Sequence, residues 1–361
     1  MKIGIVGLPN TGKSTLFNAL TGSHAVAADY PYSTVEPNIG LVTVPDTRLE
    51  YLKEMYTPKK TTYATIEFVD IAGLPKGASR GEGLGNRFLS YIREVDAILH
   101  VVRCYKTNES PFCDPLSDIE IVEMELIFAD LEIVGRRYQK VEKASKTDRS
   151  LIPEAEFLKR LLNLLENGRT ARELEATTPQ EIAILKEMPL LTSKPVIFVA
   201  NISDEDFWNV TEKENEYTGL IKTYASSCNA AAMEICALAE QEMAQLGEEE
   251  RNAFLEEVGR ERGLYLLIRQ SYALLNLISF LTAGTPEVRA WTITKGTKAK
   301  QAAGKIHSDL ERGFIRAEII AFDDLKETGS MVAAKEKGLI RIEGKDYIMK
   351  DGDITLIRFN V

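Results

Sequence analysis

The chain of 361 residues has few of the side chains on which metal centres and disulfide frameworks depend. Three histidines are present, and the spacing of the four cysteines, Cys104, Cys113, Cys228 and Cys236, fits no zinc-binding or redox motif. We therefore expect reduced and mostly buried thiols, as in a protein of the cytoplasm. This pattern excludes a fold that disulfides hold together.

Long apolar runs are lacking as well. The best candidate, Tyr265–Leu281, is interrupted by Arg269, Gln270, Ser271 and Asn276, so it falls short of the roughly 18 apolar residues of a membrane helix. The first residues, Met1–Gly7, contain one lysine and a short apolar run that ends in a glycine, which is not the pattern of a signal peptide. We expect a cytoplasmic protein with no membrane partner.

Positive charge is also in deficit. The chain has 44 Lys and Arg against 54 Asp and Glu, a net charge of −10, which argues against loose binding of DNA or RNA by the whole surface. The deficit is uneven, because Leu281–Val361 has 14 basic against 12 acidic residues and the remainder has 30 against 42. If part of the protein faces RNA, we expect it to be this C-terminal part.

The first 280 residues alternate short β-rich apolar runs with helical patterns. The strand candidates are Lys2–Val6, Ile39–Val44, Ala64–Val69, Ala97–Val102 and Pro195–Ala200. Strands that alternate with helices are typical of an α/β domain whose mostly parallel sheet has helices on both faces. We therefore expect a domain of this class over residues 1–280.

Between about residues 115 and 193 the pattern changes to long, charged helices. Ile119–Ser145 and Pro153–Gly168 have helical periodicity, and the polar turn Lys146–Arg149 lies between them. This arrangement predicts an inserted α-helical hairpin, or short antiparallel coiled coil, that projects from the α/β domain. The alternative is that these are two ordinary surface helices of that domain.

The C-terminal part has a different pattern of expected helices and strands. A helical pattern is expected from Glu248 to Phe280, and short strands follow. The strand candidates are Val288–Thr294, Ile315–Ile320, Leu339–Ile342, Tyr347–Met349 and Thr355–Phe359. We expect residues 281–361 to form a small, separate α+β domain.

One motif predicts the chemistry. Residues 7–14, Gly-Leu-Pro-Asn-Thr-Gly-Lys-Ser, match the P-loop pattern G-x-x-x-x-G-K-[ST] between an expected strand and an expected helix, and Thr15 follows. The N–H groups of such a loop converge on phosphate oxygens at the start of a helix, where the helix dipole also favours anions. Lys13 can reach the β- and γ-phosphates as a catalytic group, and the Ser14 hydroxyl can bind Mg²⁺.

Two further segments are expected to bind Mg²⁺ and the γ-phosphate and so to form a nucleotide-dependent switch. Asp70-Ile71-Ala72-Gly73 follows a buried strand, so Asp70 can hold Mg²⁺ through water and the Gly73 N–H can approach the γ-phosphate. Between the first helix and the next strand, a hydroxyl can join the Mg²⁺ shell when the γ-phosphate is present. Thr34 is the predicted ligand, with Ser33 as the alternative.

The sequence predicts slow intrinsic hydrolysis. Position 74, where Ras-like enzymes orient water with a glutamine, is Leu74. None of the three histidines, His24, His100 and His307, offers an obvious substitute, and His100 lies in an apolar strand while His24 lies in a loop. Asn10 can help to bind K⁺ beside the phosphates, although a solvent-facing loop asparagine is an equal alternative.

Recognition of the base is expected after a late strand. Asn201-Ile202-Ser203-Asp204 is in register with the guanine-reading motif N-K-x-D, but Ile202 replaces the lysine that packs across the base. Guanine specificity is therefore expected to be weakened. A second base loop is predicted at Cys236-Ala237, with Glu240 shortly beyond.

These residues resemble the YchF, or Obg-like ATPase, subfamily of the Obg GTPases along essentially the whole chain. The segments that carry the resemblance are Gly4–Thr15, Tyr30–Pro37, Asp70–Gly85, Val101–Cys104, Asn201–Glu205, Ala283–Ala290, Gln301–His307 and Gly344–Val361. Two features depart from the family pattern. The base loop commonly reads N-x-x-E, whereas here Asp204 precedes Glu205, and Tyr105–Asp118 contains no histidine.

The resemblance implies a P-loop G domain, an inserted helical hairpin and a C-terminal TGS domain of β-grasp type. It also implies ATP in preference to GTP, and association with the ribosome, as large subunit or whole particle, and its RNA, with a role in translation or stress. The residues carried over are Asn10, Thr11, Gly12, Lys13, Ser14 and Thr15 at the phosphates, Ser14 and Thr34 at Mg²⁺, and Asn201 and Ile202 at the base. The alternatives are a GTPase of the same fold and a nucleotide-gated adaptor with incidental turnover.

Overall fold

The protein is described by a computed structural model that covers residues 1–24, 37–73, 84–107, 111–208, 215–258 and 262–360. The chain divides into two units. Unit 1 comprises Met1–Val42 and Glu67–Leu264, and unit 2 comprises Thr43–Ile66 and Tyr265–Val361. Each unit is described by itself.

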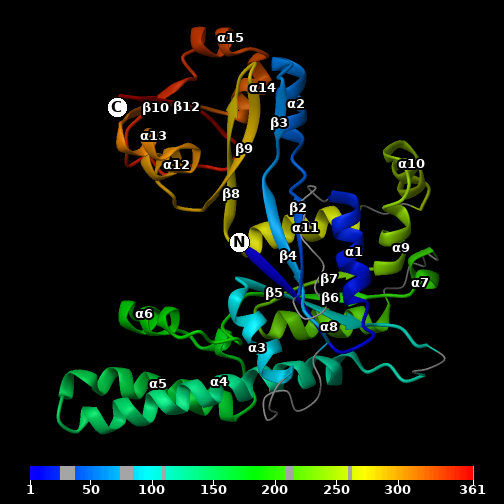
Figure 1. The fold of residues 1–361 in the computed structure, drawn as a ribbon, viewed down its shortest axis with the longest axis vertical. Helices are drawn as coiled ribbons and strands as arrows, with labels where there is room; N and C mark the ends of the chain where they lie inside the picture. Colours follow the sequence, from blue (N-terminus) through cyan, green and yellow to red (C-terminus); the bar gives the residue numbers. More distant parts are fainter. Residues whose placement is uncertain (25–36, 74–83, 108–110, 209–214, 259–261, 361) are drawn as a thin grey trace. The chain divides into compact units, whose positions relative to one another are not determined.

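Unit 1 is built on a six-stranded sheet of order β2-β4-β1-β5-β6-β7 (Figure 1). Its strands are β1 (Lys2–Val6), β2 (Asn38–Thr43), β4 (Thr65–Asp70), β5 (Ala97–Arg103), β6 (Val196–Asn201) and β7 (Ala231–Ile235). Every pairing from β4 across to β7 is parallel. The carboxyl ends of β1, β4, β5, β6 and β7 therefore meet at one edge, where ligands of open α/β sheets bind.

Several helices of unit 1 accompany this sheet. They are α1 (Lys13–His24), α3 (Leu84–Glu94), α7 (Asp204–Trp208), α8 (Glu216–Ser227), α9 (Ala237–Met243) and α10 (Glu248–Val258). The next helix, α11 (Gly263–Leu274), begins in unit 1, and its residues from Tyr265 onward belong to unit 2. A core that α3, α8 and α9 share with the sheet includes Val6, Val69, Ile98 and Phe198, all less than 5% exposed. β6 is buried along its whole length, as expected for a central parallel strand. The predicted α/β class is confirmed.

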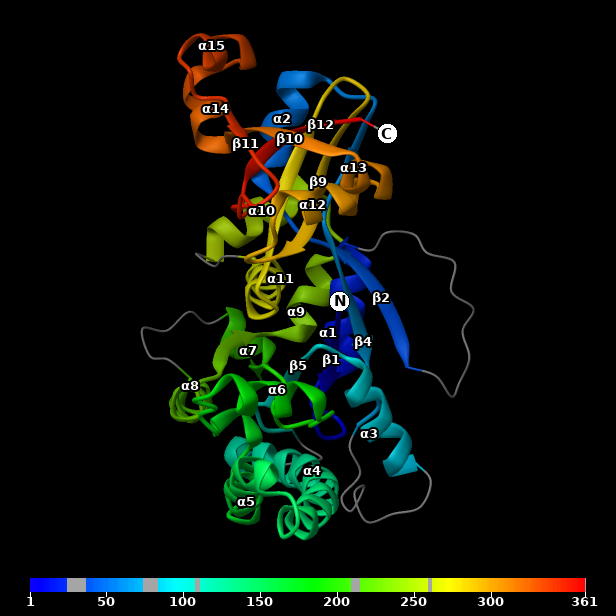
Figure 2. The same ribbon diagram turned by 90° about the vertical axis from the view of Figure 1, so that its left-hand side faces the viewer.

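The helical insert of unit 1 is a hairpin with its own core. Its helices are α4 (Pro115–Ser145), α5 (Ile152–Glu166) and α6 (Pro179–Glu187), with short 3₁₀ turns at Arg149–Leu151 and Ala171–Glu173. α4 and α5 lie side by side in both views (Figures 1 and 2). Val134, Leu158, Leu161 and Leu165 are buried between these elements. The buried Asp130 carboxylate accepts hydrogen bonds of 2.8 Å from the N–H groups of Leu191 and Thr192, which anchors the returning chain to α4.

Unit 2 contains a second six-stranded sheet of order β11-β10-β12-β8-β9-β3. Its strands are β3 (Lys60–Thr62), β8 (Leu277–Ala283), β9 (Glu287–Thr294), β10 (Phe314–Ala321), β11 (Arg341–Glu343) and β12 (Asp353–Phe359). The helices are α2 (Thr47–Tyr56), α12 (Ala299–Ile306), α13 (Ser308–Arg312), α14 (Phe322–Thr328) and α15 (Met331–Glu336). Phe280, Ile293, Ala302 and Ile319 form part of its core.

The structure differs from the sequence expectation at the start of this unit. The helix expected to reach Phe280 ends at Leu274, because Asn276 adopts a left-handed φ of 52° and β8 then pairs antiparallel with β9. β8 runs through the expected domain boundary at Leu281, and Thr43–Ile66 belongs to unit 2 although the sequence places it in the first domain. The strand expected at Tyr347–Met349 is reduced to a single bridge between Ile348 and Lys298.

None of the helices in the described ranges is both long and apolar enough to cross a membrane.

Candidate functional site

The P-loop connects β1 to α1 at the carboxyl edge of the parallel sheet. Gly7 and Gly12 have φ values of 155° and 93°, and Asn10 adopts a left-handed φ of 62°. A Cβ at Gly7 would lie 2.4 Å from the Val101 carbonyl oxygen, and one at Gly12 would lie 2.3 Å from Asn201 Nδ2. Only glycine fits at both positions, so the loop can bend tightly over the end of the sheet.

Lys13 lies at the start of α1 and is 7% exposed. Its Nζ donates a 2.6 Å hydrogen bond to the Leu8 carbonyl, which holds the ammonium group across the loop. Burial lowers the pKa of Lys13, and the nearby Asp70 carboxylate partly opposes that shift. A cation in a partly desolvated loop at a helix N-terminus is suited to binding an anionic phosphate chain.

Ser14 and Asp70 meet beside this lysine. The Ser14 hydroxyl donates a 2.8 Å hydrogen bond to Asp70 Oδ2. Asp70 Oδ1 is buried and has no hydrogen-bond partner among the described residues. Burial raises the pKa of Asp70, while the Ser14 hydrogen bond and the charge of Lys13 lower it. A serine hydroxyl beside a carboxylate with an unused buried oxygen fits Mg²⁺, which prefers oxygen ligands and water.

Gly73 lies against the P-loop. A Cβ on Gly73 would be 3.1 Å from the main-chain nitrogen of Pro9, so its backbone approaches the loop more closely than most side chains would allow. The predicted Mg²⁺ ligand Thr34, its alternative Ser33, and Leu74 lie outside the described residues.

Asn201 joins three segments of the site. Its Nδ2 donates to the Thr11 carbonyl and its Oδ1 accepts from the Ala237 N–H, each at 2.9 Å. The Ile202 N–H donates to the Ile235 carbonyl at 2.9 Å. These hydrogen bonds bring the P-loop, the end of β6 and the start of α9 together at one place, which we call the base corner after its predicted role.

A hollow of about 840 Å³ opens at this corner. The predicted residues Gly12, Thr15, Asn201, Ile202 and Asp204 line it. Ile202 is nevertheless only 2% exposed and belongs to the core of unit 1, so most of its side chain does not face the hollow. Cys236 caps α9, its Sγ accepting from the Ala239 N–H at 3.4 Å, and burial raises the pKa of its thiol.

Three acidic side chains follow Ser203 at the rim of the hollow. Asp206 is already engaged, since its Oδ2 accepts from the Ser203 hydroxyl at 2.8 Å and from Asn215 Nδ2 at 3.1 Å. Asp204 is exposed, and in the described part of the chain its carboxylate accepts no hydrogen bond. Asp204 is therefore available to a ligand in the hollow.

Sequence reasoning missed one wall of the hollow. Tyr105, Lys106 and Thr107 follow β5, and Tyr217 comes from α8. The first three could have been found, because β5 is the strand next to β1 and its carboxyl end must open at the same edge of a parallel sheet. His100, by contrast, is buried in β5 with its ring 5.4 Å from that of Phe198, and burial lowers its pKa to about 3, so it is a neutral core residue.

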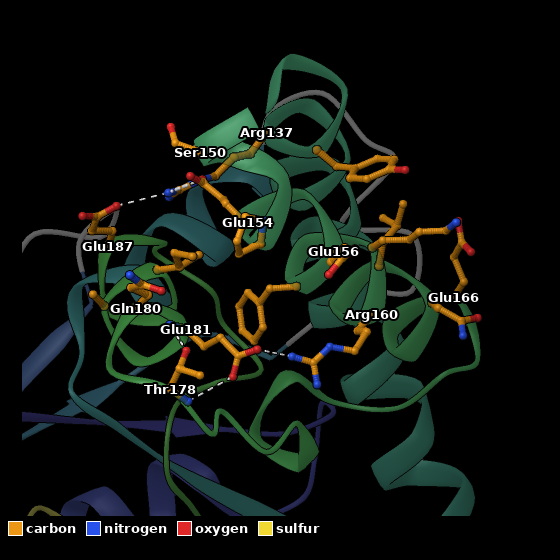
Figure 3. A pocket seen from close by; sticks show the side chains of 18 residues that line it. Arg137, Ser150, Glu154, Glu156, Arg160, Glu166, Thr178, Gln180, Glu181 and Glu187 are labelled. Carbon is orange, nitrogen blue, oxygen red and sulfur yellow. Dashed lines mark hydrogen bonds and ion pairs between the residues drawn. The ribbon is translucent and has the colours of Figure 1, made fainter. Parts of the chain in front are cut away.

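A larger hollow of about 1250 Å³ lies on the helical insert (Figure 3). Ion pairs line its walls, between Arg137 and both Glu154 and Glu187, and between Arg160 and Glu181. Its residues all come from α4, α5, α6 and the turns beside them, and none comes from the P-loop or the base corner. We do not assign the nucleotide to this hollow, because its two arginines are already paired with carboxylates.

Comparison with known proteins covers both ends of the chain. A family model described as a 50S ribosome-binding GTPase matches residues 2–128. The YchF GTPase C-terminal family model, described as a protein of unknown function, matches residues 277–360.

Full-length relatives agree with these matches. The chain is 50% identical to the ribosome-binding ATPase YchF of Bacillus subtilis (strain 168), over 99% of each chain. It is 41% identical to Obg-like ATPase 1 of Rattus norvegicus, over 100% of this chain and 92% of the relative. The solved structure of the Schizosaccharomyces pombe YchF GTPase matches with a TM-score of 0.87 at 36% identity, over 99% of this chain and 97% of that one. These full-length relatives show that the chain belongs to the YchF family of Obg-like ATPases.

Proposed function

We propose that this protein is a switch-type P-loop nucleotide hydrolase that binds ATP with Mg²⁺, hydrolyses it slowly and associates with the ribosome. The observation that carries the proposal is the arrangement of Lys13, Ser14 and Asp70 at the start of α1. A partly desolvated ammonium, a hydroxyl and a carboxylate with a free buried oxygen lie together at one helix N-terminus. This set of groups matches a nucleoside triphosphate with its magnesium ion.

In this proposal each group has a defined task. The N–H groups of residues 10–15 and the Lys13 ammonium bind the phosphate chain, and Lys13 neutralises charge that develops on the β- and γ-oxygens. Ser14, Asp70 and Thr34 hold Mg²⁺, directly or through water. When bound, Mg²⁺ would supply positive charge that stabilises the phosphates. Gly73 supplies an N–H at the γ-phosphate, so its segment responds to hydrolysis.

Slow turnover follows from position 74. A leucine cannot orient the attacking water by hydrogen bonding, so the chain lacks there the group that glutamine provides in Ras-like enzymes. Asn10, which is exposed at the loop, is the proposed K⁺ ligand. Potassium beside the phosphates would supply positive charge in place of a positive finger residue.

ATP is the proposed substrate, with GTP as the second candidate. Relatives at 41–50% identity are named ATPases, which favours ATP. The available carboxylate of Asp204 favours GTP, because a carboxylate can accept from the N1 and N2 donors of guanine. The proposed association with the ribosome rests on the names of the bacterial relatives and on the family model of residues 2–128.

A titration tests the choice of base. Purified full-length protein is titrated with fluorescently labelled ATP and GTP in Mg²⁺ and K⁺, alongside Asp204→Asn. We expect wild type to bind ATP more tightly, and Asp204→Asn to retain this preference. The opposite result would be tighter binding of GTP than of ATP by wild type, with GTP affinity at least about tenfold lower in Asp204→Asn because a hydrogen-bond acceptor for guanine is removed. That result would make the protein a GTPase. Turnover measured with and without added ribosomes tests the association.

A further inference from the structure

The charges of the helical hairpin are sharply segregated along its first helix. Residues 115–135 include six acidic residues and no lysine or arginine, whereas residues 136–150 include six lysines and arginines and two acidic residues. The basic set is Arg136, Arg137, Lys140, Lys143, Lys146 and Arg149. In a chain of net charge −10, this is a local reversal of sign at the free end of one element.

Two of these six cations are already paired. Arg136 forms an ion pair with Glu132, and Arg137 forms ion pairs with Glu154 at 2.7 Å and Glu187 at 3.2 Å (Figure 3).

The other four, Lys140, Lys143, Lys146 and Arg149, are exposed, and none has an ion-pair partner among the residues that the structure describes. We call these four residues the tip cations.

The two acidic residues nearby do not neutralise the tip cations directly. The Asp148 carboxylate accepts hydrogen bonds from the N–H and the hydroxyl of Ser150, at 2.9 and 2.7 Å, and these bonds lower its pKa. The Glu142 carboxylate accepts from the Tyr138 hydroxyl at 3.0 Å. Asp148 thus caps the 3₁₀ turn at Arg149–Leu151 and fixes the shape of the connection.

The connection between α4 and α5 forms a well-defined end of the hairpin. α4 ends at Ser145, the capped turn follows, and α5 begins at Ile152, so the connection lies at the end of the hairpin away from the sheet of unit 1 (Figure 1). Val141 is buried in the hairpin core, only one residue from Lys140. The tip cations are therefore presented by a packed element.

The helix dipole accounts for only part of this set. Cations in the last turn of a helix gain about 0.3–1 kcal/mol, and the effect falls off beyond that turn. Lys143 is the basic residue in the last turn of α4, whereas Lys140 precedes that turn and Lys146 and Arg149 follow the helix. Stability of α4 therefore does not explain the other three.

We propose that the hairpin tip, residues 140–149, docks onto the phosphate backbone of double-helical RNA. Phosphates are the complement of four unpaired, exposed cations, and the acidic remainder of the chain limits the contact to this end. The tip contains no aromatic residue that could stack on a base, so the contact is independent of base sequence. This inference deepens the proposed association with the ribosome, on which it rests for its setting, by naming ribosomal RNA helices as the partner of the tip.

The test compares two matched triple variants of the full-length protein. One is Lys140→Gln/Lys143→Gln/Lys146→Gln, and the control is Lys159→Gln/Lys186→Gln/Lys326→Gln, which removes three exposed lysines elsewhere. Binding to a labelled RNA duplex of about 20 base pairs is followed by fluorescence anisotropy over a range of salt concentrations, since small RNA-binding domains span ~16 base pairs. ATP turnover and co-sedimentation with ribosomes are measured in parallel.

We expect the tip variant to bind the duplex at least about tenfold more weakly. The slope of log affinity against log salt concentration should become shallower by about three, which corresponds to about three lost phosphate contacts. The control should match wild type, and both variants should retain ATP turnover. Equal duplex binding by tip variant and control would overturn the proposal, as would wild-type protein that does not bind the duplex.

Loss of ribosome binding by the tip variant with intact duplex binding would also overturn it, in favour of a protein partner. If wild type binds the duplex through the tip but does not co-sediment with ribosomes, the proposed function fails and the RNA-binding tip stands.

Discussion

At the scale of single residues, Asp70 has to satisfy two opposing requirements. Its carboxylate is partly desolvated, and burial raises its pKa above the usual range for an aspartate. Its Oδ1 has no hydrogen-bond partner in the described part of the protein. The ionised form is therefore unfavourable in the ligand-free fold and becomes favourable when a cation binds. If Asp70 holds Mg²⁺ as proposed, the energetic cost of holding this charge prepares the site for the cation.

Asp70→Asn should separate the stability of the ligand-free fold from the binding of the cation. Because the folded-state pKa of Asp70 is raised, the protonated form favours folding, and that contribution is lost as pH rises through the folded-state pKa. Near neutral pH the asparagine variant should thus be as stable as wild type or more stable without ligand. It should lose the stabilisation by Mg²⁺·ATP, about 2.7 kcal/mol when the ligand is at 100 times its Kd.

Thermal unfolding with and without Mg²⁺·ATP measures both effects, with the exposed Asp323→Asn as control. A full ligand-induced shift in Asp70→Asn would show that this carboxylate does not take part in metal binding.

At the scale of elements, Glu240 connects two helices. It lies in α9 and accepts backbone hydrogen bonds from Gly263 and Leu264 at the start of α11. A Cβ on Gly263 would lie 2.6 Å from Glu240 Oε1, so the carboxylate sits directly on the helix N-terminus. Burial is the largest influence and raises the pKa of Glu240 to about 7, against the favourable hydrogen bonds and the charges of Arg262 and Arg251.

Glu240→Gln should therefore change the pH dependence of stability. The protonated carboxyl stabilises the fold below the unfolded-state pKa, and this contribution declines as pH rises from about 4.5 to about 7. We expect the glutamine variant to be more stable than wild type at pH 8, by up to about 3 kcal/mol, with little difference at pH 4.5. Urea unfolding at the two pH values measures this. An equal difference at both would mean that ionisation of Glu240 is not responsible.

The hairpin is an element with its own core, and this has a measurable consequence. Leu161 is fully buried within the cluster of the insert. Leu161→Ala should lower the free energy of unfolding by about 2–5 kcal/mol, because a buried leucine leaves a cavity. Nucleotide affinity should change less than twofold, since the P-loop and the base corner take no residue from this cluster. A loss of affinity comparable to that of Asp70→Asn would show that the hairpin and the nucleotide site fold as one unit.

The elements also show what a sequence can and cannot predict. The P-loop, Asp70 and Asn201 were predictable because each is a local motif at the end of a strand. β8 was missed because Leu277–Ala283 is an apolar run that periodicity does not distinguish from the end of a helix. β3 was missed because it is only three polar residues long, and its parallel partner β9 lies more than 200 residues away in the chain.

The burial of Ile202 was not predictable either. The motif places this residue beside the base, but whether its side chain faces the ligand depends on the neighbouring strands. Here its N–H pairs with the Ile235 carbonyl after β7, and its side chain packs into the core. The wall formed by Tyr105, Lys106 and Thr107, by contrast, could have been predicted, because these residues follow β5 and the carboxyl ends of parallel strands open at one edge of the sheet.

At the scale of the whole molecule, a net charge of −10 limits how this protein can contact RNA. The slight basic excess of residues 281–361 made that part the sequence-based candidate, but Lys298 is paired with Asp346 at 2.8 Å. The four tip cations of the hairpin lack such partners among the described residues. A surface of this kind should make only a few phosphate contacts at a time.

The salt dependence of ribosome association should reflect that small number. With about four phosphate contacts, raising monovalent salt from 50 to 200 mM should weaken association by about a hundredfold. Co-sedimentation over this range gives the slope, and Lys298→Glu/Lys300→Glu reports whether the C-terminal part contributes. An unchanged slope in that variant assigns the contact to other cations, and a slope lower by about two assigns it to the C-terminal part. A slope near zero would contradict phosphate contacts altogether, because neutralising RNA phosphates releases counterions.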